Sequence, residues 1–103
     1  MLKKEIEFHE EARSETLAAH AWYSERSEVV ASRFVSELEQ SLGFIQAGPK
    51  RWPGYVSDTR RFFLRHFPFV VVYRETADTI QVLALAHMRR RPGYWKLRES
   101  NRS

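Results

Sequence analysis

The side chains best suited to proton transfer lie in the second half of the chain. His87 ends an apolar run and is followed two residues later by Arg89. An imidazole titrates near neutral pH, which makes His87 a candidate general acid or base. The same ring could instead close the end of a strand through a hydrogen bond to the backbone. Residue type and spacing leave these two interpretations with equal weight.

Arginines suited to phosphate binding come in two groups. Arg61 and Arg65 are four residues apart in a run predicted as a strand, so both would lie on one face with Phe63 between them. At about 3.3 Å per residue, such a face could bind two phosphates about 13 Å apart, although arginines that are merely solvated fit the spacing too. The second group, Arg89–Arg91, carries guanidinium forks that match phosphates and carboxylates alike.

Four aromatic side chains near these groups allow two interpretations. Tyr94 and Trp95 could stack on nucleic-acid bases, or they could form a C-terminal plug over the edge of the core. We expect the plug. Trp52 and Tyr55 belong to a loop that contains proline and glycine, and we expect them to fold back over the sheet.

The length and composition predict one small domain. With 103 residues the chain fits a single domain over 1–103, ordered to about residue 98 and frayed over 99–103. It has no cysteine, and His9, His20 and His66 have no partner at a metal-ligand spacing. No apolar run approaches the roughly 18 residues of a membrane helix, and the N-terminus lacks the apolar region of a signal peptide. We therefore expect a cytoplasmic protein without metal, cofactor or membrane contact.

Charge is distributed unevenly along the chain. Residues 1–47 hold 5 Lys or Arg against 9 Asp or Glu, a net charge of −4, whereas residues 48–103 hold 12 against 4, a net charge of +8. A strongly basic half attracts polyanions, which include RNA, DNA and acidic proteins. The alternative is a basic segment that serves solubility alone. The size of the asymmetry favours a binding role.

The hydrophobic pattern predicts a first strand followed by two helices. Alternation over 2–8 indicates the strand, and Glu10 and Glu11 favour a helix N-terminus directly after it. The apolar face of this first helix would comprise Ala12, Leu17, Ala19, Trp22 and Tyr23. After a break at 24–27, a second helix would run to Gly48-Pro49, with an apolar stripe of Val30, Phe34, Leu38, Leu42 and Ile45.

Three β-rich runs follow the loop at 50–58. They cover 60–66, 69–74 and 80–87, and the connections between them are so short that neighbouring strands must be antiparallel. The two helices would form an antiparallel hairpin on one face of the sheet, giving a two-layer α/β sandwich. The opposite face would then carry exposed polar side chains, and we expect the functional site there.

Three segments resemble proteins of the RelE/ParE toxin superfamily. I-E-F-H-E-E-A at 6–12, with A-W-Y-S-E-R at 21–26, is similar to the strand-to-helix start of these toxins. R-R-F-F-L-R-H-F-P-F-V-V-V-Y-R at 60–74 resembles their hairpin, and V-L-A-L-A-H-M-R-R-R-P-G-Y-W at 82–95 resembles the last strand and basic end of plasmid-stabilisation proteins. The resemblance implies a RelE-like α/β fold and the toxin of a type II toxin–antitoxin pair, neutralised by a cognate antitoxin.

The resemblance leaves the target open. Toxins of the RelE branch cut messenger RNA on the ribosome, whereas those of the ParE branch poison DNA gyrase without chemistry of their own. For RNA cleavage, His87 or Tyr94 would transfer protons and Arg65 or Arg89 would stabilise the phosphorane. Contacts to nucleic acid or to an acidic antitoxin would come from Arg60, Arg61, Arg90, Arg91 and Lys96.

The sequence departs from the nuclease branch at two places. Val70 stands just after the hairpin turn, where that branch usually keeps an arginine, and Phe63 fills one of two lysine positions while Arg61 could replace the other. Losing a cation that stabilises the transition state costs a few kcal/mol of barrier, so the departures leave the enzyme assignment open. Two further alternatives are a non-toxic antitoxin-binding module on the same fold and a nucleic-acid-binding domain unrelated to toxins.

Overall fold

The computed structural model describes residues 3–100, and its four strands form one sheet. The elements in chain order are β1 (Glu5–Phe8), α1 (Glu10–Ser24), α2 (Glu28–Ala47), the short 3-10 turn η1 (Val56–Asp58), β2 (Arg60–Phe63), β3 (Phe69–Glu75), β4 (Thr79–His87) and α3 (Lys96–Ser100). The predicted order of one strand, two helices and three strands is confirmed. Residues 2 and 101–103, which were assigned to the first strand and the frayed tail, lie outside the described range.

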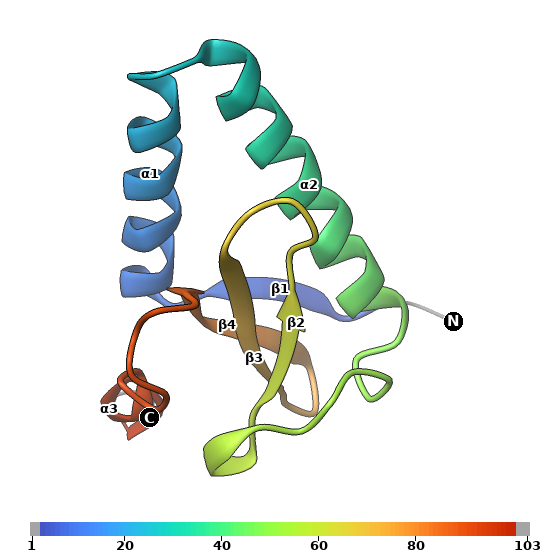
Figure 1. Ribbon diagram of the computed structural model, residues 1–103. Helices are drawn as coiled ribbons and strands as arrows, with labels where there is room; N and C mark the ends of the chain where they lie inside the picture. The colour runs from blue at the N-terminus through green and yellow to red at the C-terminus, as the bar shows by residue number, and fades with distance from the viewer. Residues whose placement is uncertain (1–2, 101–103) are drawn as a thin grey trace.

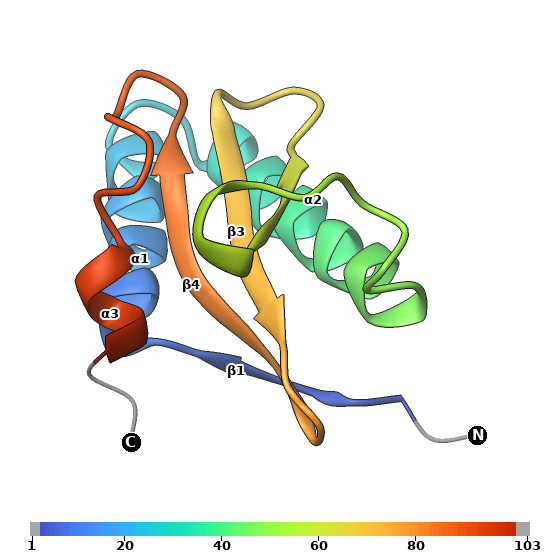
Figure 2. The ribbon, with the colours of Figure 1, turned by 90° about the horizontal axis from the view of Figure 1, so that it is seen from below.

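The sheet has the strand order β1-β4-β3-β2, with both long helices on one face. In Figure 2, α1 and α2 lie behind the sheet, and α3 and the loop before β2 lie on the viewer's side. The last three strands pair antiparallel to one another, as their short connections require. β1 instead pairs parallel to β4, because the helices and strands between them supply the long crossover that a parallel pair needs.

Both long helices begin and end where local chemistry favours it. The His9 side chain accepts a hydrogen bond from the Glu11 backbone at the start of α1, and Ser27 caps α2 by accepting from the Val30 N–H. The predicted end of α2 is confirmed: the helix stops at Ala47 and Gly48 caps it. Within the described residues, no helix is long and apolar enough to cross a membrane.

The helices bury different kinds of side chain against the sheet. Phe34, Leu38 and Ile45 of the predicted α2 stripe are buried in one cluster with Val71 and Leu85. The predicted face of α1 is wrong in part, because Leu17 and Trp22 are 63% and 52% exposed. α1 instead places small residues, Ala12 and Ala19, in the core. Small side chains let a helix approach the neighbouring β4 strand closely.

The face of the sheet away from the long helices is also apolar, which corrects the expectation of a polar face. Val70, Val72, Leu83, Ala84 and Ala86 form a second buried cluster, which Trp95 covers at 1% exposure. The continuous apolar runs in β3 and β4 explain this, since strands apolar on both sides need cover on both faces. The predicted C-terminal plug is therefore confirmed for Trp95.

Replacing a residue of the α2 stripe tests this packing. We expect Leu38→Ala to lower the free energy of unfolding by about 2–5 kcal/mol, since Leu38 is 6% exposed and the cavity left behind adds to the lost burial. Leu17→Ala on the exposed side of α1 is the control and should change it by less than about 0.5 kcal/mol. Equal urea midpoints for the two variants would show that α2 presents a different face to the sheet.

Candidate functional site

The predicted site residues are brought together in part. Arg61, His87 and Arg90 line one pocket of about 180 Å³ on the face of the sheet away from the long helices, together with Tyr55 and Trp95. Within the described range, no group of three or more His, Asp or Glu side chains could hold a metal ion. The pocket offers guanidinium groups, an imidazole and aromatic rings, and its cationic groups suit the binding of anions.

Arg61 is held in this pocket by aromatic rings. It is the second residue of β2, paired with Val72, and its guanidinium lies 4.2 Å from the ring centroid of Tyr55 and 5.1 Å from that of Phe63. Its Nε atom is buried and has no hydrogen-bond partner in the part of the chain that the structure describes. Arg61 thus presents a buried donor on an ordered, planar cation.

Trp95 contributes a second buried donor to the same pocket. Gly93 adopts a φ of 87°, a left-handed turn that suits glycine, and brings the chain back over the sheet just before α3. The indole stacks on Tyr55 with ring centroids 5.3 Å apart. Its Nε1 is buried without a hydrogen-bond partner among residues 3–100.

His87 lines this pocket and also a second, larger one between α1 and the ends of β3 and β4. Its Nδ1 accepts a hydrogen bond from the Arg89 backbone N–H at 3.1 Å, and its ring packs edge-on against Phe69. This is the backbone interaction that one of the two sequence interpretations requires. It leaves Nε2 as the ring nitrogen available for proton transfer or ligand binding.

Tyr94 is tied to α1 through its hydroxyl group. Its hydroxyl donates to a Glu15 carboxylate oxygen at 2.6 Å, and the Arg90 guanidinium lies 3.8 Å from its ring centroid. Burial raises the pKa of Tyr94 well above its ordinary value, and the hydrogen bond to Glu15 raises it further. The phenol therefore stays protonated at physiological pH, held in a contact within the fold.

The prediction that Arg61 and Arg65 share one strand face is wrong. β2 ends at Phe63, and Leu64 turns into the core at 5% exposure, so Arg65 lies in the bend before the Phe67-Pro68 turn. The Arg65 and His66 backbone N–H groups donate instead to the Glu37 carboxylate on α2. The single strand face that would bind two phosphates about 13 Å apart, at about 3.3 Å per residue, therefore does not form.

Several other predicted residues lie outside the pocket. Arg65, Arg89, Arg91 and Lys96 are exposed, and none of them lines the pocket. Arg60 donates to the Trp52 carbonyl at 2.7 Å and so fastens the loop that carries Tyr55. The ring of Trp52 packs edge-on against the ring of Phe62, with the two centroids 4.6 Å apart. This contact agrees with the expectation that Trp52 folds back over the sheet.

A side-chain clasp closes the edge of β4 next to the site. β1 pairs with β4 only as far as Val82. Beyond that point Glu15 accepts from the Leu85 N–H at 3.0 Å, and Arg98 donates to the Leu83 carbonyl at 2.9 Å. Arg98 also donates to both Glu15 carboxylate oxygens, at 3.0 and 3.1 Å, so an ion pair takes the place of a missing strand.

The sequence patterns single out neither member of this clasp. One signal does point to Glu15: it follows Ala12 by three residues and precedes Ala19 by four, so a carboxylate stands in the buried stripe of α1. Arg98 lies in the C-terminal segment, for which the sequence indicates a basic character and no defined role. Burial disfavours its charge, but the carboxylate of Glu15 holds the pKa of Arg98 above its ordinary value.

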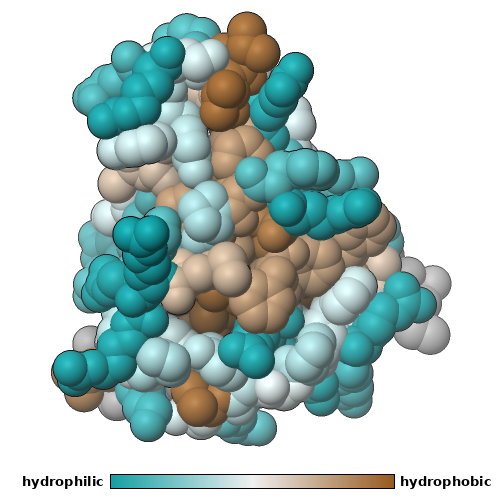
Figure 3. All heavy atoms as spheres, in the orientation of Figure 1, coloured by the Kyte–Doolittle hydropathy of each residue, from teal (hydrophilic) through white to brown (hydrophobic). Residues whose placement is uncertain are grey.

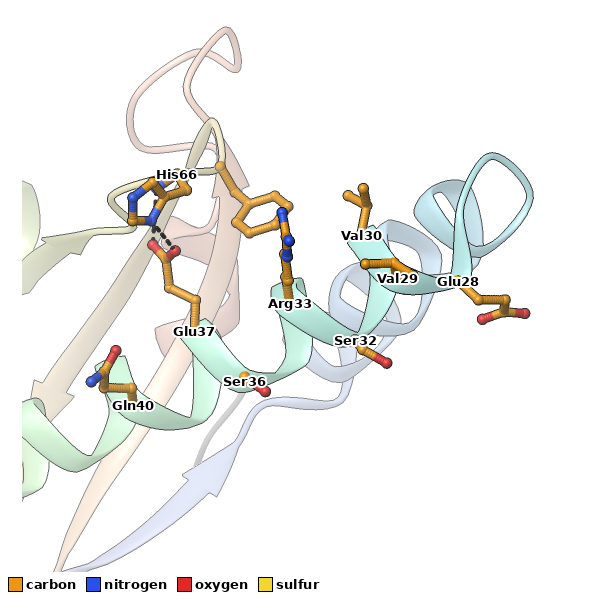
Figure 4. A pocket seen from close by; sticks show the side chains of 10 residues that line it. Glu28, Val29, Val30, Ser32, Arg33, Ser36, Glu37, Gln40 and His66 are labelled. Atoms are coloured by element: carbon orange, nitrogen blue, oxygen red, sulfur yellow. Dashed lines mark hydrogen bonds and ion pairs between the residues drawn. The ribbon is translucent and has the colours of Figure 1, made fainter.

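Two further hollows flank the helices. One of about 460 Å³ lies between α1 and the ends of β3 and β4, with apolar walls that include Trp22 and Phe69. Three predicted site residues, His87, Arg90 and Tyr94, also line it. A wider, shallower one runs along α2, where Figure 4 shows Arg33 beside the bonded pair of His66 and Glu37. Figure 3 shows apolar surface between α1 and α2 on this side of the molecule.

Glu37 joins α2 to the β2–β3 turn at the wider hollow. It accepts hydrogen bonds from the His66 backbone at 3.0 Å and from the His66 ring at 2.8 Å, besides the bond from Arg65. Burial opposes its ionisation, but these hydrogen bonds hold the pKa of Glu37 below its ordinary value. The carboxylate therefore fixes the turn in its charged form.

Comparison with protein families decides the kinship of the chain. The family model described as the ParE toxin of the type II toxin–antitoxin system, parDE, matches residues 6–92. This protein belongs to the ParE toxin family. The match runs from β1 through Arg61 and Arg90, and Trp95 and Arg98 lie beyond its end.

A solved structure supports the same fold. It is described as the chromosomal ParDE toxin–antitoxin system from P. aeruginosa, and it superposes with a TM-score of 0.72 over 82% of this chain and 96% of that chain. At 18% sequence identity the likeness speaks for the fold alone. No curated protein sequence matches the chain.

Removing the carboxylate of the clasp tests its structural role. We expect Glu15→Ala to destabilise the fold by about 3 kcal/mol, because it removes the carboxylate that accepts two hydrogen bonds from the buried Arg98 guanidinium and leaves only the exposed Glu11, 3.6 Å away, as an ion-pair partner. Glu39→Ala, an exposed glutamate within α2, is the matched control and should change stability by less than about 0.5 kcal/mol. Urea denaturation measures both, and exchange of the Leu85 amide proton should accelerate only in Glu15→Ala.

A Glu15→Ala variant as stable as Glu39→Ala, with unchanged Leu85 exchange, would contradict the clasp.

Proposed function

We propose that this member of the ParE toxin family arrests growth by binding DNA gyrase in the cytoplasm, and that a cognate acidic antitoxin neutralises it. The observation that carries the proposal is the incomplete assembly of the residues expected to cleave RNA: His87 and Tyr94 line one hollow, but neither candidate for stabilising the phosphorane lines it. Arg65 and Arg89 lie outside the pocket of His87, and the Tyr94 hydroxyl is engaged by Glu15. A catalytic set without its two expected cations favours action by binding over chemistry.

Charge supports an acidic partner. The second half of the chain carries a net charge of +8, and Arg89, Arg90 and Arg91 are all exposed beside the pocket. An acidic segment that folds on binding would be drawn to this end of the molecule. The parDE description of the family supports an antitoxin as that partner.

One observation keeps a second candidate function in view, namely cleavage of ribosome-bound messenger RNA. Arg61, His87 and Arg90 share one pocket, and the Nε2 of His87 is available for proton transfer. A histidine and two arginines could in principle supply the proton transfer and the charge stabilisation that phosphodiester cleavage needs. The two candidates differ in whether one side chain is indispensable.

Inducing the gene in a bacterial host separates these candidates. We expect growth arrest with double-strand DNA breaks and intact messenger RNA, and rescue by co-expressing a small acidic protein encoded beside the gene. His87→Gln should leave the arrest nearly unchanged, since binding energy is spread over several side chains. Arg33→Gln, at an exposed arginine of α2 outside the pocket, is the control.

Three other outcomes would count against the proposal. Cut sites within codons, abolished by His87→Gln alone, would identify the ribosome-dependent nuclease. Normal growth with tight binding of the acidic protein would identify a non-toxic antitoxin-binding module. Normal growth without such binding would contradict a toxin of either kind.

A further inference from the structure

Two hydrogen-bond donors are buried without partners at one small pocket. The Nε of Arg61 and the Nε1 of Trp95 are the buried side-chain nitrogens for which residues 3–100 offer no acceptor, and both residues line the pocket of about 180 Å³. Buried polar groups in folded proteins nearly always find a partner. Two such donors on residues 34 positions apart in the sequence indicate that the pocket is built around an acceptor from elsewhere.

The charge and shape of the pocket define that acceptor. Arg61, His87 and Arg90 line it, and none of its described lining residues is acidic. The Arg61 guanidinium is already held between Tyr55 and Phe63, so little further ordering is needed when its fork engages a planar group. An Arg fork and a carboxylate match in geometry, and burial strengthens the contact.

The surroundings favour a protein carboxylate over a nucleic-acid phosphate. Phe63 and Met88 line the pocket and are 45% and 57% exposed, so apolar surface adjoins the cationic groups. An amphipathic acidic segment supplies both a carboxylate for Arg61 and apolar side chains for these two residues. A phosphate backbone supplies the anion only. The pocket is also smaller than the roughly 300 Å³ at which sites for whole small molecules begin.

We propose that this pocket binds one Asp or Glu side chain of an acidic partner segment, with Arg61 and the Trp95 indole as its hydrogen-bond donors. The inference rests on the proposed function for the source of the carboxylate, the antitoxin. It extends that function by assigning the contact with the carboxylate to Arg61 and Trp95. Trp95 lies beyond residues 6–92, which the family model matches.

The indole N–H of Trp95 gives a direct readout. In ¹⁵N-labelled protein its resonance is identified by elimination with Trp22→Phe and Trp52→Phe. We expect sodium acetate, titrated against sodium chloride at equal ionic strength, to shift this resonance in a saturable way. Arg61→Lys keeps the charge but loses the fork, and it should weaken the acetate response at least about tenfold. Arg33→Lys, at an exposed arginine of α2 away from the pocket, should match the wild type.

Each other outcome overturns the carboxylate site. A resonance that does not move with acetate would mean that water alone satisfies the two donors. A saturable shift with inorganic phosphate but not with acetate would assign the pocket to nucleic-acid phosphates. An acetate response equal in Arg61→Lys and Arg33→Lys would remove Arg61 from the contact.

A second arm uses the antitoxin encoded beside the gene. Its binding should shift the same indole resonance, and its dissociation constant should rise at least about tenfold in Arg61→Lys but not in Arg33→Lys. Equal affinity for the two variants would overturn this inference while leaving the proposed neutralisation intact. No binding of the antitoxin to any form would overturn the proposed neutralisation, whereas the acetate titration would still decide the pocket.

Discussion

The free edge of β4 imposes the constraint on which the rest of the molecule depends. β1 leaves this edge after Val82, and the backbone groups of Leu83 and Leu85 then face a side that no strand covers. An open edge in a small protein invites pairing with another chain. Glu15 and Arg98 supply an acceptor and a donor from two helices, and their ion pair fastens the C-terminal segment where a strand would otherwise lie.

The position of the C-terminal segment determines what the sheet can offer to a partner. With Arg98 fixed, Trp95 covers Val72 and Leu83, and Tyr94 is directed toward Glu15. The face of the sheet away from the two long helices therefore becomes a second core with a small cationic pocket at its rim, and it no longer resembles an open catalytic surface. This arrangement fits a toxin that acts by docking on its target, with the basic Arg89–Arg91 run exposed beside the pocket.

The parts of the fold that follow from local pattern could be predicted, and those that depend on distant contacts could not. The stripe of Phe34, Leu38 and Ile45 recurs with the helical period, so its burial is readable from sequence. The end of β2 at Phe63 cannot be predicted from the sequence pattern, because Leu64 leaves the strand to pack in the core and takes Arg65 with it.

The candidate site shows the same division. Arg61, His87 and Arg90 were identified by residue type, and the structure places them at one pocket. The clasp could not be identified from the sequence, because Glu15 and Arg98 are 83 residues apart and no periodicity connects them. The family match identifies the toxin kinship but ends before Trp95. The plug at Trp95 is expected from the sequence, whereas the clasp comes from the structure alone.

The most direct test of action by binding is a supercoiling assay with purified protein and DNA gyrase. The account predicts that the protein inhibits supercoiling and traps linear, gyrase-cleaved DNA, and that it leaves messenger RNA on purified translating ribosomes intact. Unimpaired supercoiling, together with cleavage of the ribosome-bound messenger, would contradict it.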